Sequence, residues 1–163
     1  MAASSFRGAQ TIAVDLDDVK LETARAAGVS HTIHAGRDKL RERLTKITNG
    51  RGPDVVIVAV GSAETFHAAV ELVAFTGRVV YIGYVKDPVK YETRLFVQKE
   101  LDILGTRNAL PEDFPEVIRM LDEHRFPVDD AVSSIVTLDE APKALFAWSE
   151  NPSRMKKIMV CLD

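Results

Sequence analysis

Short apolar runs rich in β-branched residues alternate along this chain with stretches in which apolar residues recur every three or four positions. The first pattern is typical of buried strands and the second of amphipathic helices. It predicts strands at Thr11–Asp15, His31–His34, Asp54–Val60, Arg78–Gly83, Leu101–Thr106 and Lys157–Leu162. It predicts helices at Asp17–Ala27, Asp38–Thr48, Ala63–Ala74 and Pro111–His124, one or two helical turns at Thr93–Lys99, and a helix from the capping box Thr137–Glu140 to Trp148.

The order of these elements, βαβαβ at the start, predicts an α/β fold with a Rossmann-like parallel sheet and helices on both faces. Asp54–Val60 is almost wholly apolar, which indicates a strand covered on both faces. Ser62 is placed to cap a helix, and Pro111 to occupy the first position of one. Because no linker, repeat or low-complexity tract interrupts the pattern, we expect one domain over residues 1–163.

Composition narrows the class of protein. A chain of 163 residues and 18.0 kDa suits one soluble domain, and a net charge of −3 argues against nucleic acid as a partner. No apolar run approaches the ~20 residues that span a bilayer, so we expect no membrane association. The single cysteine, Cys161, cannot form an internal disulfide or anchor a multi-cysteine metal site, and is expected to be a buried small hydrophobe. A reducing, cytoplasmic location is the expectation.

Asp15 is the clearest candidate for chemistry, because it ends a predicted strand just before a predicted helix. In dinucleotide-binding folds an acid at this place accepts hydrogen bonds from the adenosine ribose and favours NAD over NADP. The alternative is that Asp15, Asp17 and Asp18 simply cap a helix N-terminus. Arg107, after another strand, could contact an anion or lie in solvent.

No Gly-rich phosphate loop occurs in the chain. In a Rossmann unit that loop precedes the ribose-binding acid by ~20 residues, whereas fourteen residues precede Asp15. The first strand and phosphate turn of such a fold are therefore expected to lie outside this sequence, with Met1–Phe6 the tail of the first crossover helix. The four histidines show no spacing that would complete a metal site.

Four segments together resemble zinc-type medium-chain alcohol and polyol dehydrogenases, such as sorbitol dehydrogenase. They are VDLDDVKLETARAAGVSHTI, DVVIVAVGSAETFHAAVELVAFTGRVVYIG, LDILGTRNALPEDFPEVIRML and VTLDEAPKALFAWSENPSRMKKIMV. The likeness covers nearly the whole chain, and GTRNA leans toward members that act on polyols or sugar acids. Family members are about twice as long, and nothing here matches their GroES-like domain with its zinc ligands. The resemblance implies the C-terminal, coenzyme-binding half.

The resemblance also implies roles for individual residues. Asp15 matches the ribose-binding acid and Lys20 a basic residue beside the adenosine. Val60 and Gly61 match the adenine-side wall, and Lys156 a basic residue that reaches the pyrophosphate. The remaining matches lie near the nicotinamide and the substrate: Ile82, Gly83, Tyr84, Thr106 and Arg107.

The activity implied for the whole enzyme is zinc- and NAD-dependent oxidation of a secondary hydroxyl to a ketone. Because zinc ligands and phosphate cradle are lacking, we expect weak or absent NAD binding and little activity from this chain alone. Two alternatives are a non-catalytic nucleotide-binding module and a self-associating structural remnant.

Assembly follows from the strand order 3-2-1-4-5-6 of the Rossmann sheet. Without the first, central strand, Thr11–Asp15 and Asp54–Val60 would each have an unpaired edge, a state that favours association or aggregation. In the family, the strand matching Leu101–Thr106 lies at a subunit interface. We therefore expect a homo-oligomer that uses Leu101–Thr106, and a possible partner chain that carries the N-terminal half.

Overall fold

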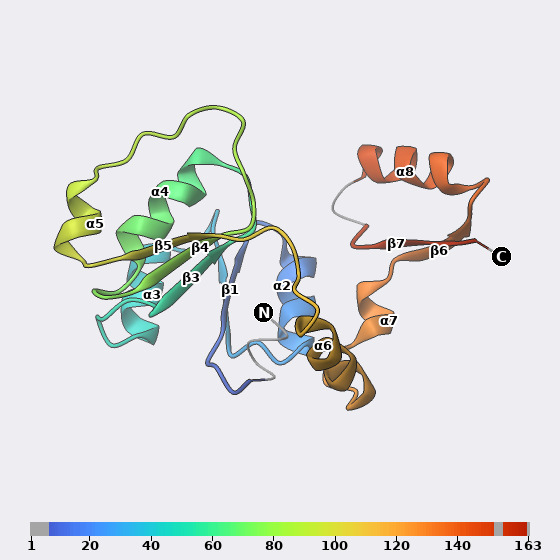
Figure 1. Cartoon of the computed structure of the whole chain (residues 1–163), viewed down its shortest axis with the longest axis horizontal. Helices are drawn as coiled ribbons and strands as arrows, with labels where there is room; N and C mark the ends of the chain where they lie inside the picture. Colours follow the sequence, from blue (N-terminus) through green and yellow to red (C-terminus); the bar gives the residue numbers. More distant parts are fainter. Residues whose placement is uncertain (1–6, 152–154, 163) are drawn as a thin grey trace. The chain divides into compact units, whose positions relative to one another are not determined.

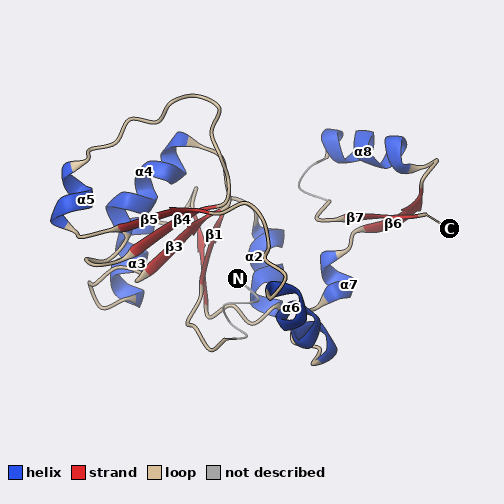
Figure 2. Ribbon diagram, viewed as in Figure 1, coloured by secondary structure: helices blue, strands red, loops and turns tan. Residues whose placement is uncertain are grey.

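The computed structural model describes residues 7–151 and 155–162, in which strands and helices alternate (Figure 2). The strands are β1 (Ile12–Asp15), β2 (His31–His34), β3 (Val55–Val58), β4 (Arg78–Tyr81), β5 (Asp102–Gly105), β6 (Ser134–Thr137) and β7 (Ile158–Cys161). The helices are α2 (Asp18–Ala26), α3 (Leu40–Ile47), α4 (Ala63–Leu72), α5 (Arg94–Gln98), α6 (Asp113–Asp122), α7 (Val128–Ala131) and α8 (Ala141–Glu150). The predicted α/β class is confirmed.

Every strand pair is parallel (Figure 1). Within the described residues β1 pairs with β2, the order β3-β4-β5 forms a second sheet, and β6 pairs with β7. Within the described residues β1 and β3 therefore each lie at the edge of a sheet, as expected for a Rossmann order without its first strand. The predicted unpaired edges are present on both strands.

The chain divides into two compact units, which are described separately. One unit runs from Lys39 to Ala109 and contains the three-stranded sheet. The other joins the residues up to Asp38 with those from Leu110 onward, and contains the two two-stranded sheets.

In the 39–109 unit, α4 packs on one face of the sheet through a cluster of small and β-branched residues. The cluster consists of Val58, Ala69, Val73 and Val79, all buried. Val55 and Ile57 point to the opposite face of β3, because successive side chains of a strand alternate, and they are 49% and 50% exposed. The expectation that this strand is covered on both faces is wrong for the described residues, since α4 lies against one face alone.

In the other unit, α2 packs on β1 and β2 through buried Ala13, Leu21 and Val29. The helix begins at Asp18 because the Asp17 side chain accepts hydrogen bonds from the backbone N–H groups of Val19 and Lys20. This cap fixes the direction in which the chain leaves β1, and so places the residues that follow Asp15.

Some local predictions need correction. Pro111 lies in a turn rather than at the first helical position, because α6 begins at Asp113, whose carboxylate accepts from the backbone N–H of Leu110. Cys161 is exposed, not buried. The sequence pattern did not predict helix α7 or strand β6. The expected helix tail at Met1–Phe6 falls outside the described residues.

Candidate functional site

All but two of the residues singled out by the resemblance lie at or just beyond the carboxyl end of a parallel strand; Lys20 and Lys156 lie elsewhere. Asp15 ends β1, Val60 and Gly61 follow β3, and the remaining ones follow β4 and β5. In open α/β sheets this end of the strands is where ligands bind. Asp15 belongs to one unit, and the residues that follow β3, β4 and β5 belong to the other.

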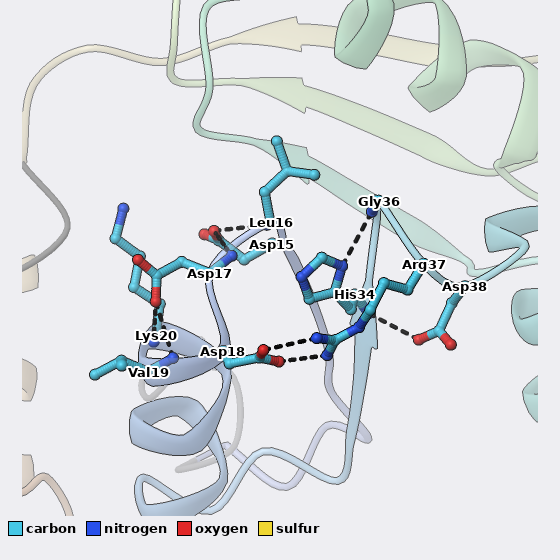
Figure 3. Close-up of polar contacts among 10 residues, drawn as sticks. All are labelled: Asp15, Leu16, Asp17, Asp18, Val19, Lys20, His34, Gly36, Arg37 and Asp38. Atoms are coloured by element: carbon cyan, nitrogen blue, oxygen red, sulfur yellow. Dashed lines mark hydrogen bonds and ion pairs between the residues drawn. The ribbon is translucent and has the colours of Figure 1, made fainter.

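Asp15 belongs to a tight turn between β1 and α2 (Figure 3). Its Oδ1 accepts hydrogen bonds from the backbone N–H groups of Leu16 at 2.8 Å and Asp17 at 3.0 Å. Within residues 7–151 and 155–162, no donor reaches its Oδ2. Asp15 is half-buried, so one carboxylate oxygen shapes the turn while the other can accept from a ligand.

An ion pair beside Asp15 escaped the sequence analysis. Arg37 follows β2, and its Nη1 and Nη2 both donate to the carboxylate of Asp18, Nη1 at 2.8 Å (Figure 3). The hydrogen bond with Arg37 holds the pKa of the Asp18 carboxyl below its ordinary value. The feature of the sequence that could have indicated this ion pair is the basic residue Arg37, shortly after the second predicted strand. Because Arg37 is paired with Asp18, its guanidinium group is bound within the protein and is not available to an anionic ligand.

Lys20 is part of the first turn of α2, and Lys156 contacts the same helix. Figure 3 shows Lys20 and Arg37 on opposite sides of the N-terminus of α2, and Lys20 is exposed. The Nζ of Lys156 donates to Oγ1 of Thr23 in α2 at 2.8 Å. The structure therefore brings Lys156 to the helix that follows Asp15, within the same unit.

In the 39–109 unit, the turns after β3 and β4 touch each other. A Cβ added at Gly61 would lie 2.2 Å from the backbone oxygen of Tyr84, and one at Gly83 would lie 3.0 Å from backbone atoms of Ala59 and Val60. Both glycines are thus required by close backbone approach. Gly61, Gly83 and Tyr84 form one surface, as expected of neighbouring turns at a ligand-binding edge.

Backbone hydrogen bonds hold these turns in place. The N–H groups of Ile82 and Gly83 both donate to the carbonyl oxygen of Val58, at 2.9 and 3.0 Å. The N–H of Thr106 donates to the carbonyl oxygen of Tyr81 at 3.0 Å. The side chains left on this edge are apolar or aromatic and exposed, namely Val60 at 57%, Ile82 at 54% and Tyr84 at 79%.

The predicted site residues therefore fall into two groups. Asp15, Lys20 and Lys156 belong to one unit. The other unit holds Val60, Gly61, Ile82, Gly83, Tyr84, Thr106 and the exposed Arg107.

The two cofactors implied by the resemblance fit the described residues differently. The carboxylate of Asp15, whose Oδ2 no donor reaches within the described residues, fits a ribose hydroxyl of a dinucleotide. No group of three His, Cys, Asp or Glu side chains in the described part of the chain could hold a metal ion. Zinc therefore does not fit these residues. None of the described helices is both long and apolar enough to cross a membrane.

A family model described as zinc-binding dehydrogenase matches residues 1–123. The chain belongs to this family, and the match is to the C-terminal half of zinc-type alcohol dehydrogenases. This confirms the resemblance drawn from the four sequence segments.

Curated relatives support the same family. An uncharacterized zinc-type alcohol dehydrogenase-like protein of Haemophilus influenzae is 28% identical over 151 residues, which are 93% of this chain and 44% of that protein. Sorbitol dehydrogenase of Halalkalibacterium halodurans is 25% identical over 132 residues, 80% of this chain and 38% of the relative. The chain thus spans less than half the length of these relatives.

Solved structures agree with the fold. An alcohol dehydrogenase from Thermus sp. ATN1 superposes with a TM-score of 0.87 at 26% identity, over 99% of this chain and 47% of that one. A short chain alcohol dehydrogenase from E. coli CFT073, complexed with NADH, superposes with a TM-score of 0.86 at 20% identity, over 99% and 47%. The Rossmann-like fold is confirmed.

Proposed function

We propose that this chain is the cofactor-binding part of an NAD-dependent zinc-type dehydrogenase, and that residues 1–163 form a truncated dinucleotide-binding domain. The observation that carries the proposal is the carboxylate of Asp15, which ends β1 with its Oδ2 available to a hydroxyl donor. In Rossmann folds, an acidic residue at this position accepts a hydrogen bond from a ribose hydroxyl.

The neighbouring charges support NAD as the cofactor. A 2′-phosphate beside Asp15 would be repelled by its carboxylate, and Arg37, one of the cations near the N-terminus of α2, is paired with Asp18. When bound, NAD supplies the acceptor for a hydride from the alcohol carbon. Asp15 would hold the ribose, Lys156 the pyrophosphate, and the turns at Gly83 and Tyr84 would border the nicotinamide.

The substrate class comes from relatives. Sorbitol dehydrogenase of H. halodurans, a D-xylulose reductase of Saccharomyces cerevisiae and L-galactonate-5-dehydrogenase of Escherichia coli are among them. As its substrate we assign the whole enzyme a polyol or sugar acid, whose secondary alcohol group it oxidises to a ketone. Because the described residues offer neither a zinc site nor a Gly-rich phosphate loop, the chain alone binds NAD weakly and is inactive. A cytoplasmic location belongs to the same proposal.

A second candidate function, self-association without catalysis, is favoured by β5. This strand pairs with β4 at one edge, and all four of its residues are exposed. Such an edge is a template for a strand of another chain. A homo-oligomer through Leu101–Thr106 would use it, and a partner chain that carries the N-terminal half is a separate part of this proposal.

The test is an NMR titration of the purified chain with NADH and NADPH, because chemical shifts report even weak binding. We expect NADH to bind more tightly than NADPH. Asp15→Asn keeps the Oδ1 acceptor of the turn but removes the charge, and should weaken NADH binding by about 1.5–3 kcal/mol. The control is Asp122→Asn, an exposed change in α6.

Equal affinity of the wild type for NADH and NADPH would count against the assignment of Asp15. Absence of binding of both, with an intact fold, would favour the structural alternative. Metal analysis after chelator treatment completes the test, since stoichiometric zinc would contradict the absence of a zinc site from this chain.

A further inference from the structure

A pair of tyrosines closes the loop that follows β4. The hydroxyl of Tyr91 donates to the hydroxyl oxygen of Tyr81 at 3.0 Å, and the Tyr81 hydroxyl donates to the carbonyl oxygen of Phe66 at 3.3 Å. Tyr81 is the last residue of β4. The two side chains therefore join the two ends of the segment 82–90, which carries Ile82, Gly83 and Tyr84.

Aromatic packing fixes both rings. Phe66 of α4 stacks on Tyr81 with centroids 4.3 Å apart, while Tyr91 meets the ring of His67 edge-on at 5.7 Å and lies 5.5 Å from that of Phe96. The hydroxyl–hydroxyl bond is part-buried. Burial raises the pKa of Tyr81 well above its ordinary value, so this hydroxyl stays protonated and keeps its role as a donor.

Tyr81 also ties this loop to the neighbouring strands. Its carbonyl oxygen accepts from the N–H of Thr106, and the residue after it donates to Val58. At the far side of the loop, the backbone oxygen of Tyr84 lies where a Cβ on Gly61 would clash. The loop thus rests on β3 at its start and is held by Tyr91 at its end.

We propose that Tyr91 is a positioning residue, whose hydrogen bond to Tyr81 holds Gly83 and Tyr84 in the shape that receives the nicotinamide end of the cofactor. This inference rests on the proposed function, since it assigns these turns to the nicotinamide. Tyr91 itself touches no cofactor. It acts by limiting the conformations of the loop before binding, which lowers the cost of ordering it.

Tyr91→Phe tests this, because it removes one hydroxyl and leaves the ring packing intact. NMR titrations compare NADH with ADP-ribose, which has the adenosine and both riboses but no nicotinamide. We expect Tyr91→Phe to weaken NADH binding by about threefold to tenfold, the loss of one neutral hydrogen bond, and to leave ADP-ribose binding unchanged. Thr45→Val, which removes the hydroxyl bonded to the carbonyl oxygen of Arg41 in α3, is the matched control.

Hydrogen exchange provides a readout that does not need the cofactor. In Tyr91→Phe the amides of residues 82–91 should exchange faster, while those of β3 should not. Tyr81→Phe removes this bond and also the bond to the carbonyl oxygen of Phe66, so it should affect the loop at least as much. Adding Tyr91→Phe to it should change little, because the bond between the two hydroxyls is already lost.

Three results would overturn the inference: unchanged exchange in the loop, unchanged NADH binding, or an equal loss for NADH and ADP-ribose. If the wild type binds neither ligand, the proposed function fails, and the exchange data alone decide whether Tyr91 holds the loop.

Discussion

Asp15 and Asp18, three positions apart at the start of α2, make different interactions. Asp15 uses one carboxylate oxygen for the turn and has no donor at the other within the described residues, whereas Asp18 accepts from Nη1 and Nη2 of Arg37. A sequence pattern identifies Asp15, because strand ends are visible as the last residue of an apolar run. It cannot identify the pair of Asp18 with Arg37, which are 19 positions apart and meet through the parallel pairing of β1 with β2.

The pairing of Arg37 predicts how cofactor preference can be changed. Asp18→Asn should free the guanidinium, which can then bind a 2′-phosphate through charge-assisted hydrogen bonds. We expect the affinity for NADPH relative to NADH to rise by up to about fivefold, in keeping with one exposed charge pair. NMR titrations of Asp18→Asn and of Asp122→Asn measure it, and an unchanged ratio would show that Arg37 lies out of reach of the ribose.

At the scale of elements, the sequence located β1 to β5 and β7 to within a few residues, because each is short and contains Val, Ile or Thr. It missed β6 (Ser134–Thr137), in which only two apolar residues lie between two polar ones, and α7, a single turn. It also misjudged Val55 and Ile57. Apolar side chains on both faces show that a strand is suited to burial on both sides. Which face a helix covers depends on how the whole fold packs, and this is not encoded in the strand itself.

The contact between the turns after β3 and β4 depends on Gly61. Gly61→Ala should drive a methyl group into the backbone of Tyr84 and lower the free energy of unfolding by about 1–3 kcal/mol. Gly105→Ala is the matched control, because a Cβ there meets nothing within 4 Å, and should change it by about 0.5 kcal/mol or less. Urea denaturation measures both. Similar losses in the two variants would mean that the close approach is relaxed in solution.

At the scale of the whole molecule, exposed carboxylates govern the response to acid. The pKa values of Asp18, Glu116 and Glu140 are held below their ordinary values by hydrogen bonds from Arg37, Arg119 and the backbone of Thr137. A carboxyl with a lower pKa in the folded state contributes stability above its ordinary pKa, 3.8 for Asp and 4.5 for Glu, and loses it as pH falls through the folded value.

Thermal unfolding should therefore be insensitive to pH from about 5 to 7 and shift to lower temperature below about pH 4. Glu116→Gln should reduce the acid-induced part of this shift, because it removes one of the carboxyls whose pKa is lowered in the folded state. A midpoint that rises on acidification would contradict the assignment, since it would require groups whose pKa is raised by folding.

The open sheet edges determine how the molecule should assemble. β1 and β3 each lack a strand on one side within the described residues, and β5 ends its sheet with Ile103 and Leu104 exposed at 39% and 47%. Neither a Pro nor a Lys protects β5, the two devices that commonly block edge pairing. Two copies can pair along this edge about a two-fold axis, which uses the same surface of each.

We therefore expect the chain to be at least a dimer at micromolar concentration, with a mass of 36 kDa, twice 18.0 kDa. Leu104→Lys should shift it toward monomer, because a charge on the edge strand opposes pairing with a second copy. Val97→Lys, at a 78% exposed position of α5, introduces the same charge on the same unit and should leave the dimer intact. Light scattering measures all three. A folded 18 kDa wild type would refute self-association, whereas a Leu104→Lys variant that stays dimeric would move the interface to the open edge of β1 or β3.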